Sequence, residues 1–203
     1  ESPELYQKAK QVVVIDHHRK MTNYIENAVI FHHEPYASSA SEMITELVQY
    51  FGEAGKLSQY CAEALLAGIM LDTKSFVMRT GVRTFEAAAY LRKMGADTVA
   101  VRSLFANSME SYHQKTRLVA NAEVYERCAI SINDTEIPDI KVVAPQAADE
   151  LLGIAGVDAA FVIYMNNNMA CFSARSLGAM NVQIIIIVEL QLNYIIVLNV
   201  EEN

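Results

Sequence analysis

The residues best suited to chemistry stand directly after a short apolar run. Residues 12–15 are consecutive β-branched side chains, a pattern typical of a parallel strand that is buried on both faces. Asp16, His17 and His18 follow at once, and ligands of open α/β sheets bind beyond the carboxyl ends of the strands. Neutral imidazole binds metal ions, and a carboxylate can hold its second ring nitrogen. The triplet therefore predicts a metal or phosphate site; the alternative is a polar turn with two surface histidines.

A second candidate is Asp72, which follows an apolar helical segment and precedes Thr73. A carboxylate is unfavourable at a helix C-terminus, because that end of the helix dipole is negative. A divalent cation would compensate for this, whereas the alternative is that Asp72 caps the next segment. Together, His17 and Asp72 would provide one nitrogen and one oxygen ligand. Such a set favours Mn²⁺, with Mg²⁺, Co²⁺ or Fe²⁺ as the other candidates.

Three further residues are candidates for binding an anion. Arg175 ends a predicted hairpin, and a guanidinium group can bind phosphate through two parallel hydrogen bonds. Asn181 stands at a predicted helix start, where backbone N–H groups add donors. Arg79 lies in the loop after Asp72 and is a candidate of the same type. The alternative for these positions is an ordinary turn.

The elements that position these residues are indicated by hydrophobic periodicity and by capping residues. Ser39 and Glu42 have capping-box spacing, and Ser58 and Asp97 are further N-cap candidates. The adjacent His32 and His33 are expected at the surface or beside the site. The first part of the chain is expected to form strands at 12–15 and 28–31, and helices at 40–51, 58–72, 84–95, after 97, and over 110–126.

The pattern changes after about residue 115. Strands are expected at 129–132 and 140–144, followed by a short helix that starts at Pro145. Two apolar runs flank three asparagines at 166–168, which predicts a β-hairpin because asparagine tolerates positive φ. We therefore expect an α/β protein of two domains. A parallel-sheet domain would cover 1–115, and a smaller mixed α/β domain would cover 116–203.

Composition limits the classes of function. The 203 residues include 16 Lys+Arg and 24 Asp+Glu, giving a formal net charge of −8, which disfavours coating a nucleic-acid backbone. The three cysteines, Cys61, Cys128 and Cys171, are far apart and are expected to be core thiols in a reducing compartment. Residues 182–200 are strongly apolar, but polar interruptions such as Glu189 favour a core helix and strand over a membrane span.

Several motifs together resemble the DHH phosphoesterase superfamily. Val-Ile-Asp-His-His-Arg at 14–19 is similar to the motif that names the superfamily. The segments at 34–42, 68–76 and 173–183 fit the same family in the same order, and the resemblance covers about residues 10–185. The combination looks closest to cyclic-di-AMP phosphodiesterases of the GdpP type. This resemblance implies a DHH domain followed by a DHH-associated, substrate-binding domain.

The resemblance also implies a role for each matching residue. His17 and Asp72 match ligands of a manganese ion, and His17 is therefore also part of the catalytic group. His18 matches the histidine that faces the scissile phosphate, and Asp16 would orient the imidazole rings. The positions implied to contact substrate, besides His18, are Ser39, Thr73, Arg79, Ser173, Arg175 and Asn181.

The implied activity is phosphodiester hydrolysis with two Mn²⁺ ions, for which Mg²⁺ or Co²⁺ could substitute. Cyclic di-AMP would be opened to the linear dinucleotide 5′-pApA. One alternative is a nanoRNase-type enzyme that degrades pApA and short oligonucleotides. Another alternative is a non-catalytic nucleotide-binding fragment, and the least specific is an α/β domain without a ligand.

The chain also departs from the family pattern. The family has a His-x-Asn-x-Asp-x-Asp motif upstream of the DHH triplet, which we expect to lie before this chain. Residues 184–188 are isoleucine and valine where the family has a glycine-rich Gly-Gly-Gly-Gly-His loop. We expect N-terminal membrane and sensor regions in the full protein, placed at the cytoplasmic face of the membrane, while this part is soluble. The expected partners are a cyclic or linear dinucleotide and a second copy in a homodimer, but not duplex nucleic acid.

Overall fold

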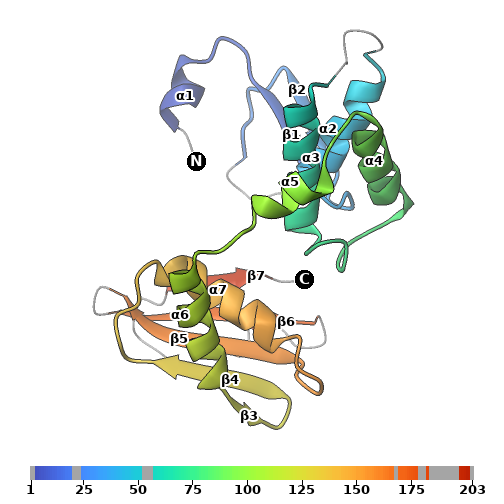
Figure 1. The fold of residues 1–203 in the computed structure, drawn as a ribbon. Coiled ribbons are helices and arrows are strands. Elements are labelled where there is room, and N and C mark those ends of the chain that lie inside the picture. Colours follow the sequence, from blue (N-terminus) through green and yellow to red (C-terminus); the bar gives the residue numbers. More distant parts are fainter. Residues whose placement is uncertain are drawn as a thin grey trace. The chain divides into compact units, whose positions relative to one another are not determined.

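The computed structural model describes residues 3–19, 24–51, 57–166, 169–177, 182 and 197–201. The chain divides into two compact units, 1–106 and 107–203, and each is described by itself (Figure 1). The domain boundary expected after residue 115 falls inside helix α6 (Met109–Ala120), all of which belongs to the second unit.

The first unit combines one small parallel sheet with helices, as the α/β class predicts (Figure 1). Its elements in chain order are α1 (Pro3–Lys8), β1 (Val13–Asp16), β2 (Ile30–His33), α2 (Ala40–Gln49), α3 (Gln59–Asp72), α4 (Val82–Lys93) and α5 (Thr98–Ser103). Helices α3, α4 and α5 share an apolar core, whose buried members are Ala62, Leu66, Ile69, Ala87, Leu91, Ala96 and Val101.

Strands β1 and β2 pair in parallel, with Asp16 opposite His33. The expectation that β1 is buried on both faces is wrong, because Val13 is 53% exposed and the rest of the strand is only half-buried. Among the described residues, β1 has a single neighbouring strand, so one edge of the pair is not covered by another strand. Strand β2 ends at His33 and not at Phe31, which places His33 level with the DHH triplet.

The helix starts follow the expected caps in three of four cases. The hydroxyls of Ser39 and Ser58 and the carboxylate of Asp97 each accept a hydrogen bond from the backbone of the first helical turn. The prediction that Thr84 opens the next helix is wrong. Gly81 is the N-cap of α4, and Thr84 lies in its first turn, where its hydroxyl accepts from the Gly81 N–H.

Helices α2 and α3 approach each other closely at a glycine. A Cβ atom at Gly68 of α3 would lie 2.1 Å from the Ser41 Oγ and 3.0 Å from the Ser41 Cβ of α2. Only a residue without a side chain permits this approach. The close contact sets the position of the last turn of α3, which ends at Asp72.

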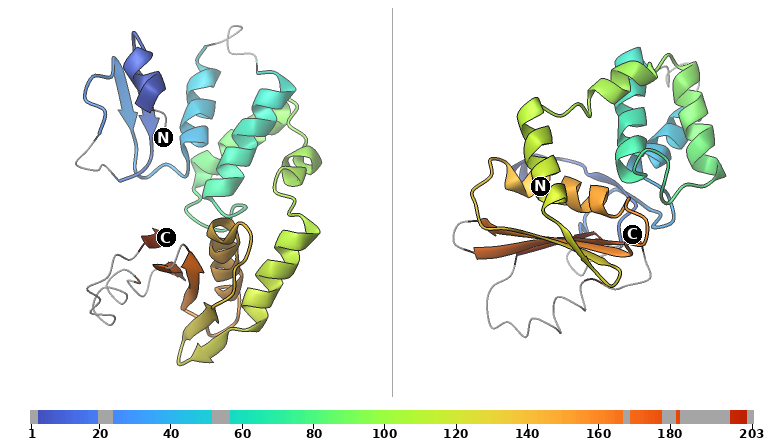
Figure 2. Two further views of the ribbon diagram at one scale, coloured as in Figure 1. Left: turned by 90° about the vertical axis from the view of Figure 1, so that its left-hand side faces the viewer. Right: turned by 60° about the horizontal axis from the view of Figure 1, so that its bottom comes forward.

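The second unit is a five-stranded sheet with two helices on one face (Figure 2). Its strands lie in the order β3-β4-β5-β6-β7, with β4–β5 and β6–β7 parallel and the other pairs antiparallel. The elements after α6 are β3 (Glu123–Tyr125), β4 (Cys128–Asn133), α7 (Ile140–Leu151), β5 (Ala159–Asn166), β6 (Met169–Ser176) and β7 (Val197–Glu201). The predicted hairpin around residues 166–168 is confirmed by the antiparallel pairing of β5 with β6.

Two expectations for this unit are wrong. Residues 140–144 begin helix α7 and do not form a strand, because Ile140, Val143 and Ala144 bury one helical face together with later residues of the same helix. Pro145 therefore lies inside this helix and not at its start. The long helix expected over 110–126 ends at Ala120, and strand β3 follows it.

The three thiols differ in burial. Cys171 is buried and Cys128 is half-buried, but Cys61 is exposed, so the expectation of three core cysteines is wrong for Cys61. Most of the apolar segment 182–200 lies outside the described residues; Val182 packs against the sheet of the second unit, and β7 begins at Val197. No helix among the described residues is long and apolar enough to cross a membrane.

Candidate functional site

Strand β1 and helix α3 bring His17 and Asp72 together in the first unit. His17 follows the last residue of β1, and Asp72 is the last residue of α3. The His17 Nε2 and Asp72 Oδ2 atoms are 3.4 Å apart. Two ligands of one ion, each about 2.1 Å from it, lie roughly 3 Å apart. The pair therefore has a spacing that suits two ligands of the same metal ion.

The Asp72 carboxylate is placed by the C-terminal end of α3. Thr73 is the C-cap residue, and its hydroxyl donates to the Ile69 carbonyl at 2.7 Å. The carboxylate remains about one third exposed, whereas the His17 ring is almost fully buried. Because the C-terminal end of a helix carries partial negative charge, a cation beside Asp72 would be favoured by both the carboxylate and the helix.

Asp16 is bound to His18 and not to His17. One oxygen of the Asp16 carboxylate, Oδ1, accepts from the His18 backbone N–H at 3.0 Å and lies 2.7 Å from the His18 Nδ1. Burial raises the pKa of Asp16, but the hydrogen bonds from the His18 backbone and ring outweigh it, so the pKa is lowered overall. An ionised Asp16 can only accept, so the His18 Nδ1 carries a proton and its Nε2 faces away from Asp16.

The segment after Asp72 forms a left-handed turn. Lys74, Ser75 and Phe76 have φ angles of 48°, 58° and 67°, and Arg79 has a φ of 52°. Side chains other than glycine adopt this region at a cost of about 1 kcal/mol or more each, so the surrounding structure must enforce it. The Thr73 hydroxyl accepts from the Phe76 N–H at 3.0 Å, and the Phe76 ring stacks on Phe85 of α4. Sequence reasoning missed this turn, because none of its residues is a glycine or an asparagine.

The other predicted substrate contacts of the first unit differ in accessibility. Ser39 and Thr73 are fully buried, and both hydroxyls are engaged in hydrogen bonds to helix backbone. In this structure the Ser39 hydroxyl caps the start of α2, and the Thr73 hydroxyl bonds to the last turn of α3. Arg79, in contrast, is exposed in the left-handed turn that follows Asp72.

Ser173 and Arg175 lie on strand β6 of the second unit, on the face that packs against α7. Arg175 is 2% exposed, and its Nε lies 3.3 Å from the Asp149 carboxylate of α7. Ser173 is fully buried, and its hydroxyl has no hydrogen-bond partner within the described part of the chain. A buried hydroxyl without a partner costs free energy, so Ser173 is a polar group with a free bonding capacity. Asn181 lies outside the described residues.

The side chains of His17 and Asp72 are of types that bind a divalent ion, but two ligands are too few to complete its coordination. One imidazole and one carboxylate suit Mn²⁺, which accepts nitrogen and oxygen ligands. Across the described residues, no group of three or more His, Cys, Asp or Glu side chains is placed to hold an ion. His17 and Asp72 could therefore provide only part of a coordination shell.

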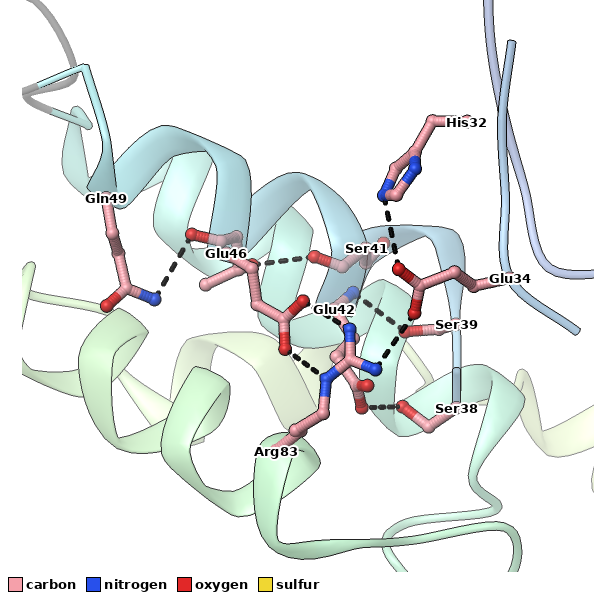
Figure 3. Close-up of polar contacts among 10 residues, drawn as sticks. His32, Glu34, Ser38, Ser39, Ser41, Glu42, Glu46, Gln49 and Arg83 are labelled. Atoms are coloured by element: carbon pink, nitrogen blue, oxygen red, sulfur yellow. Dashed lines mark hydrogen bonds and ion pairs between the residues drawn. The ribbon is translucent and has the colours of Figure 1, made fainter. Parts of the chain in front are cut away.

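A cluster around Arg83 was missed by sequence reasoning. Figure 3 shows the Arg83 guanidinium of α4 between two carboxylates: it donates to Glu46 of α2 at 2.7 and 2.6 Å and to Glu34 at 2.9 Å. The side-chain hydrogen bond from Arg83 is the main cause that lowers the pKa of Glu46. Arg83 and Glu46 also line a cavity of about 690 Å³ that has none of the predicted site residues in its wall.

Comparison with known proteins agrees with the motifs. Residues 1–69 match the family described as DHH family, N-terminal domain. The resemblance drawn from the motifs is therefore confirmed by this match.

Two relatives are similar to this chain over most of its length. The chain is 47% identical over 183 residues to the cyclic-di-AMP phosphodiesterase GdpP of Geobacillus thermodenitrificans, a match that covers 89% of this chain and 28% of that protein. It is 44% identical over 184 residues to the cyclic-di-AMP phosphodiesterase PdeA of Listeria monocytogenes, covering 90% of this chain and 28% of the relative. The chain thus spans less than a third of the length of either protein.

The fold is shared with a solved structure. An exopolyphosphatase-related protein from Bacteroides fragilis superposes with a TM-score of 0.75 at 19% identity, over 88% of this chain and 54% of that one. At this identity the likeness shows the fold alone. It supports the mixed α/β class with a parallel strand pair.

Proposed function

We propose that this chain is part of a metal-dependent phosphodiesterase that hydrolyses cyclic di-AMP to 5′-pApA. The single observation that carries the proposal is the approach of His17 to Asp72 at 3.4 Å, within a DHH-family segment. The proposal is supported by relatives that are named cyclic-di-AMP phosphodiesterases and that match about nine tenths of the chain. We propose Mn²⁺ as the ion, with Mg²⁺ and Co²⁺ as alternatives.

Each candidate residue of the first unit would have a separate role in the reaction. Bound divalent ions would supply an activated water and would neutralise the charge that develops on the phosphate. His17 and Asp72 would hold one ion. His18 would present its Nε2 to the phosphate, while Asp16 keeps the proton on Nδ1 and so fixes the ring orientation. As an imidazolium, His18 could donate from Nε2 to a phosphate oxygen and stabilise the transition state.

The second unit would contribute to nucleotide binding. Arg175 offers a planar set of donors that suits phosphate, and the adjacent Ser173 hydroxyl has unused capacity to bond. Both are buried beneath α7 in this structure, so contact with a nucleotide would require this face of β6 to be uncovered. We propose this face of β6, in the DHH-associated domain, as the nucleotide-binding part.

The test is Mn²⁺-dependent hydrolysis of cyclic di-AMP beside pApA, with products separated by chromatography. It should use the full-length gene product and the 203-residue chain in parallel. Cleavage of cyclic di-AMP to pApA by the full-length protein would support the proposal. Preference for pApA would move the protein to the nanoRNase type, and no cleavage of either compound by the full-length protein would reject a catalytic role.

A further inference from the structure

The Asp16–His18 segment is fastened to the end of strand β2 at two points. The Glu34 backbone N–H donates to the Asp16 carbonyl at 3.1 Å and so extends the parallel pairing by one bond. The His33 Nε2 lies 2.6 Å from the His18 carbonyl. A carbonyl oxygen can only accept, so the His33 Nε2 must carry the proton in this contact.

The bond between the His33 ring and the His18 carbonyl lies beyond the last paired residues of the two strands. Strand β1 ends at Asp16, and its pairing with β2 ends at the same level. Beyond that point, the His18 N–H is bound to the Asp16 carboxylate, and the His18 carbonyl is bound to the His33 ring. The backbone of His18 is therefore held on both sides, and the orientations of the His17 and His18 rings depend on it.

The end of strand β2, which carries His33, is itself held in place by side-chain contacts. The Phe31 ring lies on the same face of β2, with its centroid 5.9 Å from that of His33. Glu34 is bound by Arg83 of α4, which is bound in turn to Glu46 of α2 (Figure 3). A ring attached to such an anchored strand end can define the position of the segment that it contacts.

We propose that His33 is a positioning residue for the reaction, acting through the His18 carbonyl. The inference rests on the proposed function, since it holds that this bond orients the His18 ring toward the phosphate. His33 itself touches neither ion nor substrate in this role. Its neighbour His32, whose Nε2 lies 3.6 Å from a Glu34 carboxylate oxygen, has no side-chain hydrogen bond or ion pair with the DHH triplet within the described part of the chain, and it serves as the matched control.

The test compares three variants of the full-length gene product at saturating Mn²⁺. His33→Leu removes the donor, His33→Gln keeps an N–H donor at similar reach, and His32→Leu is the control. We expect His33→Leu to lower kcat for cyclic di-AMP by about tenfold, the worth of one net hydrogen bond, with KM within about threefold of wild type. His33→Gln should retain about a third or more of wild-type kcat, and His32→Leu should stay within about twofold.

Two results would overturn the proposal while the wild type remains active: a His33→Leu variant with wild-type kcat, or a His33→Gln variant no better than His33→Leu. Melting curves of all three variants show whether a loss of rate follows from unfolding.

Nitrogen-15 spectra of the histidine rings give a readout that does not depend on activity. We expect a proton on the His33 Nε2, and an unprotonated Nε2 would refute the contact even if neither dinucleotide were hydrolysed. An inactive wild type, in contrast, rejects the proposed function alone.

Discussion

At the scale of single residues, the two adjacent histidines of the triplet have different surroundings. The His17 side chain is 7% exposed and faces Asp72, whereas the His18 side chain is 77% exposed and bound to Asp16. Consecutive side chains leave the end of a strand in different directions, so the two histidines of one motif meet different partners. The buried ring is suited to hold an ion, and the exposed ring is suited to meet a substrate.

This difference predicts separable effects of substitution. Asp72→Ala should weaken Mn²⁺ binding by at least about tenfold, because even the partners of metal ligands cost about 10- to 100-fold when lost. His18→Ala should lower kcat by about 10²- to 10³-fold and leave Mn²⁺ affinity within about threefold, because it removes a contact to the phosphate only. Titration with Mn²⁺ and steady-state kinetics on the full-length protein measure both quantities. Unchanged Mn²⁺ affinity in Asp72→Ala, or equal losses of both in His18→Ala, would contradict these assignments.

At the scale of the elements, the site depends on how closely α2 and α3 approach. Gly68 is one helical turn before Asp72, and it meets Ser41 of α2. Rotation of the Ser41 hydroxyl would not make room for a side chain, because the Ser41 Cβ would also be 3.0 Å from the added carbon. The helices would have to move apart, and Asp72 would move with α3.

We therefore expect Gly68→Ala to destabilise the protein. Alanine improves helix propensity by about 1 kcal/mol, but overpacking costs about 1–3 kcal/mol and should outweigh it. Denaturant unfolding measures the change in stability, and Mn²⁺ titration measures the displacement of Asp72. Gly81→Ser is the control, because no atom lies within 4 Å of a Cβ at Gly81 and serine is a favourable N-cap. Equal stability of Gly68→Ala and wild type would show that the two helices separate without cost.

At the scale of the whole molecule, the candidate residues are divided between two units that have separate cores. His17, His18 and Asp72 belong to residues 1–106, while Ser173 and Arg175 belong to residues 107–203. We propose a catalytic role for the first set and a nucleotide-binding role for the second. A protein divided in this way should show separate effects on turnover and on substrate affinity.

Arg175→Lys tests the contribution of the second unit. Lysine keeps the charge but loses the planar pair of donors, so KM for cyclic di-AMP should rise by about tenfold while kcat stays within about threefold. Arg127→Lys is a matched control in the same unit, because Arg127 pairs with Asp158 at the protein surface. A fall in kcat with unchanged KM in Arg175→Lys would argue against a role in nucleotide binding. Circular dichroism should accompany the kinetics, since Arg175 also pairs with Asp149.

Features that depend on neighbours in the chain were predictable from the sequence. The caps at Ser39, Ser58 and Asp97 are correct because a side chain there bonds to backbone only two or three residues away. The antiparallel pairing of β5 with β6 is confirmed for a similar reason, since the two apolar runs that form these strands lie close together in the chain. The DHH motif was equally visible, because its residues are contiguous.

Features that depend on packing between distant segments were not predictable. The apolar run at 140–144 is compatible with a strand or a helix, and burial against the sheet of the second unit decides for the helix. The left-handed turn after Asp72 contains no glycine, so only its hydrogen bonds and the stacking of Phe76 on Phe85 select it.

By itself, therefore, the sequence determined the resemblance to the DHH family, the class of fold and the candidate residues for binding an ion or a phosphate. Only the tertiary structure decided which residues meet: His17 with Asp72, His18 with Asp16 and His33, and Arg83, which the sequence did not single out, with both Glu34 and Glu46. The physical reason is that side-chain types and local hydrogen bonds depend only on residues that are close together in the chain. The distance between β1 and the end of α3, in contrast, results from the packing of every element between them.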